Sequence, residues 1–132
     1  MRPGPGPSPV GRGERGSASV VTAAILVAIL TLALGAADLA RVLLAAARAQ
    51  TAADAAALAA AQSLAFPGEL EPTVVAADLA HRNGGRLRSC VCEPPLLEAN
   101  VMVEVPVGSL LLSSDDRVAI AEARAVVDPP SP

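Results

Sequence analysis

Apolar and polar positions divide the chain into two parts with different patterns. No residue from Gly16 to Ala37 carries a formal charge, and Ile, Leu and Val fill the middle of this run. A helix of about 20 apolar residues can cross the hydrocarbon core of a bilayer. From Asp38 onward the pattern stays helical but becomes alanine-rich, with isolated charges. We therefore predict one helix over 17–65, transmembrane at about 18–37 and an alanine-rich stalk at 38–65.

Turn residues separate this helix from a small head, predicted over 66–128. Phe66-Pro67-Gly68 ends the long helix, because the residue before a proline avoids the helical region. A second helix is predicted from Pro72 to Arg82, with proline in its first turn. Asn83-Gly84-Gly85 then suits a left-handed cap. The tail, 129–132, is expected to be frayed.

Three strands are predicted in the head. In residues 100–107, NVMVEVPV, valine alternates with other residues, and Pro106 indicates an edge or a strand end. Arg86 to Cys92 is the first strand. Arg117 to Val127 is the third, although its alanine content would also allow a helix. Short connections permit antiparallel pairing only, so the predicted fold class is α+β: a long N-terminal transmembrane helix, a short second helix and a small three-stranded antiparallel sheet.

Charge around the apolar run predicts its orientation. Residues 1–16 are rich in proline and glycine, are expected to be disordered, and carry three arginines against one glutamate. Arginines beside a span favour the cytoplasmic side. We expect a single-pass cell-membrane protein with a cytoplasmic N-terminus and an extracytoplasmic head. A cleaved signal peptide is the alternative, because Gly35-Ala36-Ala37 offers small residues for cleavage, but the apolar run is longer than is usual for one.

The sequence contains no pattern typical of catalysis or of a cofactor site. The net charge is −3, with no basic block outside the N-terminus, which excludes nucleic acid as an expected partner. His81, Cys90 and Cys92 lack the number and spacing of zinc ligands, and no phosphate loop or nucleophile elbow occurs. We expect no enzyme, cofactor, metal or small-molecule substrate. If the head is exported, the two cysteines could form a disulfide with each other or between subunits.

The long helix carries the candidate functional residues. Asp38 and Arg41 are three residues apart and can pair at the membrane exit, where water is close. The small alanine side chains give the stalk a smooth surface. Such a surface suits packing against copies of itself or related helices, or against the sheet of its own head. The residues of this predicted helix-packing motif are Asp38, Arg41, Gln50, Ala53, Asp54, Ala57 and Leu58.

Several pieces of the chain resemble a known family. The segment 15–20, RGSASV, opens the apolar run, and DLAR at 38–41 is followed by QTAADAAALAAA at 50–61. These pieces are similar to the TadE/TadG-like proteins, pseudopilin-like components of the Flp (tight adherence) pilus machinery. Features of the second half resemble the short actinobacterial TadE-like branch found in a helicase/secretion gene neighbourhood; they are Gly84-Gly85, Cys90, Val101 to Val107 and Ala119 to Val127.

The resemblance implies a pilin-like arrangement in which the N-terminal helix packs beside pilin helices. It also implies a processing site with Gly16 before the cut and Ser17 beginning the mature chain. Pilin-type sequences carry glutamate five residues after the cut, whereas this chain has Val21 there. Processing and filament incorporation therefore stay open.

Two functions follow as hypotheses. The first is a non-enzymatic minor pseudopilin or accessory subunit of a Tad/Flp-type pilus or secretion assembly, with the membrane, pilin-like or Tad subunits, and copies of itself as partners. The second is a membrane-anchored extracytoplasmic binding module outside any filament. Co-purification with pilin-like subunits would favour the first, and a monomeric head with a discrete ligand would favour the second.

Overall fold

A computed structural model describes residues 1–6, 14–66 and 68–128 of the chain. For residues 14–17 it describes the backbone but not the side chains. The elements in chain order are α1 (Glu14–Ala65), α2 (Pro72–Arg82), β1 (Arg86–Glu93), a 3-10 turn (Pro94–Leu96), β2 (Glu98–Pro106) and β3 (Val118–Val126). This order confirms the predicted α+β class with its two helices and three strands. Of the disordered leader expected over 1–16, residues 14–16 belong to the helix α1, and residues 7–13 lie outside the described residues. The tail expected to be frayed, 129–132, also lies outside them.

The element boundaries differ from the predicted ones by a few residues. The helix α1 begins at Glu14 and not at Ser17, whereas α2 has the predicted bounds. Strand β2 begins two residues earlier, at Glu98, and Pro106 closes it at a strand end. The alanine-rich segment over 118–126 is a strand, because alternate residues face the core of the head.

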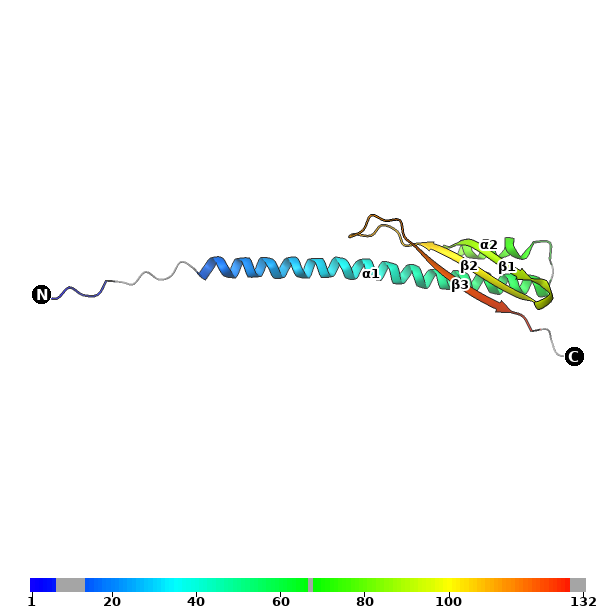
Figure 1. Ribbon diagram of the computed structural model, residues 1–132, viewed down its shortest axis with the longest axis horizontal. Coiled ribbons are helices and arrows are strands. Elements are labelled where there is room, and N and C mark those ends of the chain that lie inside the picture. The colour runs from blue at the N-terminus through cyan, green and yellow to red at the C-terminus, as the bar shows by residue number, and fades with distance from the viewer. Residues whose placement is uncertain (7–13, 67, 129–132) are drawn as a thin grey trace.

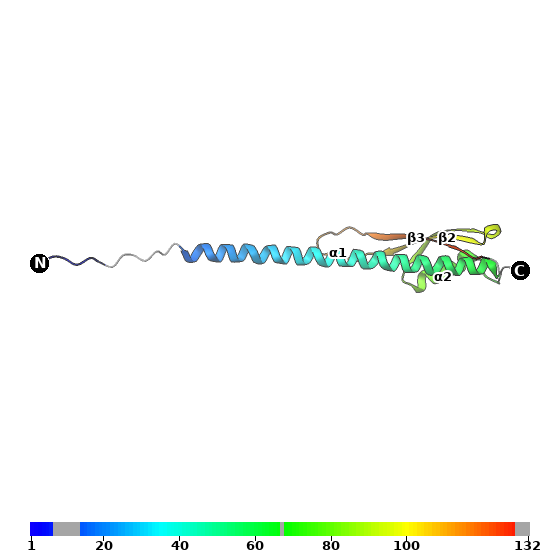
Figure 2. The same cartoon turned by 90° about the horizontal axis from the view of Figure 1, so that it is seen from below.

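The helix α1 is a rod of 52 residues, about 78 Å long at 1.5 Å per residue. Its N-terminal half projects from the head, and its C-terminal half carries the sheet and α2 (Figures 1 and 2). The side chains from 18 to 34 are exposed on all sides. One half of the helix therefore has all of its apolar surface available, and the other half is part of the head.

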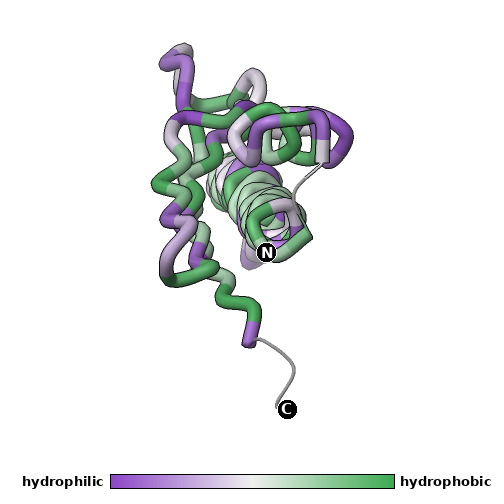
Figure 3. The backbone as a smooth tube through the Cα atoms, turned by 90° about the vertical axis from the view of Figure 1, so that its right-hand side faces the viewer, coloured by the Kyte–Doolittle hydropathy of each residue, from purple (hydrophilic) through white to green (hydrophobic). Residues whose placement is uncertain are grey.

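The core of the head is a contact between small side chains. Buried residues on α1 recur at intervals of three and four, which places them on one face of the helix. They are Ala45, Ala49, Ala52, Ala53, Ala56, Ala57, Ala60 and Ala61. Opposite them lie Val101, Val103 and Val105 of β2, with Ala76 and Ala80 of α2. Figure 3 shows the sheet and α2 on neighbouring sides of α1.

The sheet is antiparallel throughout and has the order β1-β2-β3, so β2 is central. In the register of the sheet, Val101 stands between Cys90 on β1 and Ala123 on β3. A bulge between Leu87 and Ser89 leaves Arg88 without a partner in the ladder. Because side chains alternate along a strand, one face of the sheet covers α1 and the other faces away from it.

Gly85 lies where the chain passes from α2 into β1, and there is no space for a side chain there. A Cβ atom at this position would stand 2.5 Å from Cγ1 of Val103 and 3.2 Å from Cβ of Ala52. Val103 is fully buried and β-branched, so it has little freedom to move. The close approach of this turn to the core therefore depends on glycine. Gly84, with φ of 77°, provides the predicted left-handed cap just before it.

A charged cluster lies on the outer face of the sheet. Glu104 is buried and receives Arg86 Nε at 2.7 Å and Arg88 Nη1 at 3.1 Å. The hydrogen bonds from Arg86, with the nearby charge of Arg88, hold the pKa of Glu104 below its ordinary value, against the opposing effect of desolvation. The bulge and this cluster lie on the same strand pair, so the ion pairs join β1 to β2 at the end where β1 begins.

We expect Gly85→Ala to destabilise the head by about 1–3 kcal/mol, because an added methyl group overpacks a filled site. For a domain of this size that corresponds to a lower melting temperature by about 4–8 °C per kcal/mol. Thermal unfolding of the purified chain in detergent measures the change. Gly68→Ala is the matched control, since a Cβ there meets nothing within 4 Å. Equal melting temperatures for the two variants would contradict the packing at Gly85.

We expect the contribution of Glu104 to stability to depend on pH. A carboxyl group with a lowered folded-state pKa stabilises the fold above its unfolded value, near 4.5, and this contribution is lost as the pH falls through the folded-state pKa. Glu104→Gln should therefore lower the melting temperature at neutral pH and converge with the parent chain in acid. Glu122→Gln, at an exposed position on the same face, is the control. A difference that persists unchanged in acid would contradict this origin.

Candidate functional site

Surfaces, and not an enclosed cleft, are the candidate functional features of the described residues. No group of three or more metal-type ligands comes together in this part of the chain. His81 is exposed on α2. A hollow of about 360 Å³ lies beside the end of α1, the start of α2 and Cys92. It is open to solvent and lined largely by the connection between the two helices.

Asp38 binds a loop that is distant in the sequence. Its carboxylate accepts hydrogen bonds from the backbone N–H of Leu111 at 2.8 and 3.0 Å and from that of Leu112 at 2.8 Å. Arg41 donates from Nη1 to the carbonyl oxygen of Ser109 at 2.7 Å. The side chains of Asp38 and Arg41 thus bind two backbone N–H groups and one carbonyl group of the connection between β2 and β3. We call these five residues the Asp38–Arg41 clasp.

The clasp changes the interpretation of the Asp38–Arg41 pair. The predicted pair is present, with Arg41 Nη1 at 3.6 Å from Asp38 Oδ1. An exposed pair of this kind contributes little to stability. The shorter contacts go to the loop, and a carboxylate that accepts backbone N–H groups makes charge-assisted hydrogen bonds. The Asp38 side chain is accordingly only 13% exposed.

The predicted helix-packing motif divides between two faces of the stalk. Ala53 and Ala57 are buried against the head of the same chain. Gln50 and Asp54 are exposed beside this covered face, where Gln50 Nε2 donates to Asp54 Oδ1 at 2.9 Å. Leu58, four residues further on, is 54% exposed. These three motif residues, which we call the free stripe, are exposed and are not covered by the head of their own chain.

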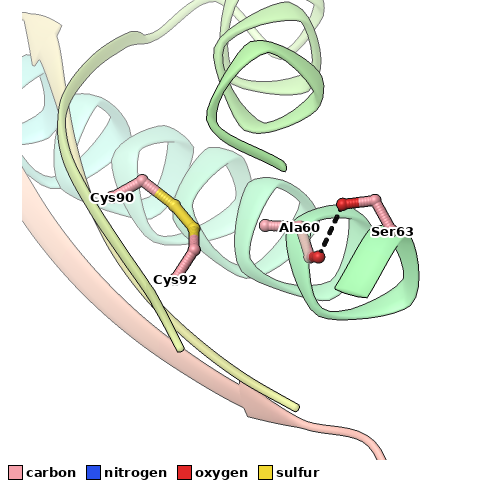
Figure 4. The surroundings of a disulfide bond; sticks show 4 residues. All are labelled: Ala60, Ser63, Cys90 and Cys92. Atoms are coloured by element: carbon pink, nitrogen blue, oxygen red, sulfur yellow. Dashed lines mark hydrogen bonds between the residues drawn. A yellow bond between two sulfur atoms is a disulfide. The ribbon is translucent and has the colours of Figure 1, made fainter. Parts of the chain in front are cut away.

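Cys90 and Cys92 are joined by a disulfide on β1. The bond lies on the face of the sheet that covers α1, near the turn in which Ser63 Oγ donates to the carbonyl oxygen of Ala60 at 2.8 Å (Figure 4). Both cysteines pack against the core. Because the two cysteines are only two positions apart in the sequence, the bond constrains the unfolded chain little. In this pairing neither sulfur is available to a second subunit.

The predicted processing site lies in the first turn of α1. Gly16 and Ser17 have helical backbone, and the ends of helices fray readily. Val21, at the position of the pilin-type glutamate, is 58% exposed on the projecting half of the helix. The structure places this site far along α1 from the clasp and the free stripe.

Sequence reasoning missed the loop that the clasp holds. The segment from Gly108 to Leu112 reads GSLLL, and it belongs to no helix or strand. Three consecutive leucines in a connection between strands are the signal that could have drawn attention to it. Their partner, Asp38, is more than 70 positions away in the sequence, so neither residue by itself indicates the other.

Comparison with known proteins yields a match over the long helix. Residues 16–63 match the family described as "Putative Flp pilus-assembly TadE/G-like". The matched stretch includes Asp38, Arg41 and the free stripe and ends before α2 and the sheet. No curated protein and no solved structure matches the chain. Through its long helix, the chain is similar to the TadE/G-like family of Flp pilus-assembly proteins, and this confirms the resemblance predicted from its sequence.

Proposed function

We propose that the chain is a single-pass membrane subunit of a Tad-type pilus or secretion assembly, a minor pseudopilin or accessory protein that acts without catalysis. The observation that carries the proposal is the division of α1 into a bare apolar half and a half with one covered face. Its match to the TadE/G-like family supports the kind of assembly. The function then lies in what the uncovered surfaces of this helix contact.

The bare half of α1 has the properties of a helix in lipid. It is the one described helix that is long and apolar enough to span a membrane. Thr31 Oγ1 donates to the carbonyl oxygens of Val27 and Ala28, at 3.1 and 2.9 Å. Thr22 Oγ1 does the same to Ala18 at 2.9 Å. These hydroxyl groups are satisfied within the helix, as a hydrocarbon environment requires.

The orientation of the protein follows from charge and from the cysteines. The arginines that precede the apolar run favour a cytoplasmic N-terminus, and the head then lies outside the cytoplasm. A disulfide between Cys90 and Cys92 is compatible with that side, because disulfides persist in oxidising compartments. Both arguments support the same topology and come from separate parts of the chain.

The partner surface of the stalk is the free stripe. Because Ala53 and Ala57 are already buried in the head, a neighbouring helix would contact Gln50, Asp54 and Leu58. Small residues continue along the bare half, among them Ala24, Ala28 and Gly35, and they allow close approach of helices in lipid. The free stripe and these small residues together give α1 a surface for pilin-like helices or for copies of itself.

Val21 supports an accessory role over that of a major filament subunit. In pilin-type helices, glutamate at this position pairs with the N-terminal amine of a neighbour, and valine cannot do this. The residue instead adds to the apolar surface of the span. Cleavage after Gly16 would free an amine at Ser17 without the usual carboxylate to receive it.

We expect a photoreactive amino acid in place of Leu58 to cross-link the chain to pilin-like or Tad subunits in living cells. The same amino acid in place of Val74, an exposed position on α2, is the control and should give few such products. Mass spectrometry of the cross-linked bands identifies the partners. Cross-linking from Val74 but not from Leu58 would refute the free stripe as the interface.

We expect the mature N-terminus to show whether the chain is processed as a pilin. A chain that begins at Ser17 supports cleavage after Gly16, whereas a start at Met1 or Arg2 excludes it. A start near Asp38 would indicate a removed signal peptide and would overturn the membrane-anchored topology. N-terminal sequencing by mass spectrometry of protein purified from the native membrane distinguishes the three.

A further inference from the structure

Three consecutive leucines lie at the tip of the connection between β2 and β3. Leu111 is 52% exposed and Leu112 is 61% exposed. The polar residues that follow, Ser113 to Arg117, lead back to β3. Large exposed apolar side chains on a short loop are unfavourable in water, so these leucines call for an apolar environment beyond the head.

The clasp fixes the position of these leucines along α1. Leu112 lies close to Gly35, where an added Cβ would stand 4.0 Å from Leu112 Cδ1. The backbone of the loop is held one turn further on, at Asp38. In Figure 1 the loop extends from the sheet back along α1, toward the bare half of the helix, and Figure 2 shows it beside the same part of α1.

That position coincides with the end of the uncharged run. Residues 17–37 extend about 30 Å as a helix, which equals the thickness of the hydrocarbon core. Gly35 is then in the last turn inside the membrane, and Asp38 is the first charged residue outside it. Leu112, beside Gly35, is level with the edge of the hydrocarbon on the side of the head.

The clasp also satisfies three polar backbone groups of the loop. Non-helical backbone near lipid is unfavourable unless its N–H and C=O groups have partners. The N–H groups of Leu111 and Leu112 donate to Asp38, and the carbonyl group of Ser109 accepts from Arg41. The polar atoms thus point to α1. The chain has no Trp or Tyr that could otherwise anchor it at the interface.

We propose that Leu111 and Leu112 insert into the lipid leaflet on the side of the head and form a second membrane contact beside α1. The occupant of this apolar surface is the bilayer, because the leucines are continuous with the apolar span. Two contacts fix the tilt and rotation of the head against the membrane, and they thereby fix the direction in which the free stripe faces. The inference rests on the proposed membrane span and deepens it.

Tryptophan fluorescence tests the insertion, because the chain contains no tryptophan of its own. Leu112→Trp, Val27→Trp and Ile120→Trp are each prepared in the full chain and reconstituted in phosphatidylcholine vesicles with brominated acyl chains. Val27 lies in the middle of the span, and Ile120 is exposed on the outer face of the sheet. Far-ultraviolet circular dichroism checks that each variant is folded.

We expect lipids brominated near the headgroup to quench Leu112→Trp strongly, and lipids brominated deep in the chain to quench Val27→Trp most. Ile120→Trp should be quenched only by aqueous acrylamide. If Leu112→Trp behaves like Ile120→Trp while Val27→Trp is quenched by lipid, the insertion is wrong and the span stands. If Val27→Trp also escapes lipid quenching, the proposed span fails, and the insertion with it. The emission of Leu112→Trp could instead be blue-shifted only when the vesicles contain more protein, with no quenching by bromine. That result would assign the leucines to a second copy and overturn the lipid contact.

Discussion

The head depends on the contact between the alanine face of α1 and the valine-rich inner face of the sheet. Its largest fully buried side chains are Val101 and Val103, and the larger Leu79 and Leu87 pack against the core only partly buried. Burial of apolar surface stabilises the fold by roughly 25 cal/mol per Å². Each alanine side chain has little surface to bury, so each contributes little. A head of this size is close to the lower limit for a self-sufficient core. Its stability therefore depends on the backbone of α1 lying close to β2 and to the turn at Gly85, and the head and the helix fold as one unit.

This dependence explains why so much of α1 is committed to its own chain. A helix that packed its alanines against another subunit would leave the sheet without a cover. Burial of one face against the head leaves the other faces of the stalk exposed, and the side chains from 18 to 34 are exposed on all sides of the helix. Asp38 and Arg41 mark the boundary between these regions, because their polar groups bind the loop at the point where the head ends along α1.

Much of the fold could be predicted from the sequence because its signals are local. The long run without charged residues predicted the apolar half of α1. Turn residues predicted where α1 ends and where α2 begins. Alternation of valine predicted β2. The sequence over 118–126 allows either a strand or a helix, because alanine is compatible with both, and pairing with β2 makes it a strand. The boundaries of β2 shifted for the same reason: where a strand starts depends on the register with its neighbours.

The sequence alone determined which residues are small, apolar or charged along the long helix, and with them the family resemblance that the comparison confirmed. Only the tertiary structure decided which side of that helix is occupied. Ala53 and Asp54 are adjacent in the same motif, yet one is buried in the head and the other is free, because the sheet covers only one face of α1. Only the fold brings Leu111 and Leu112 to Asp38, since a hydrogen bond between residues 73 or 74 positions apart leaves no periodic signal in the sequence.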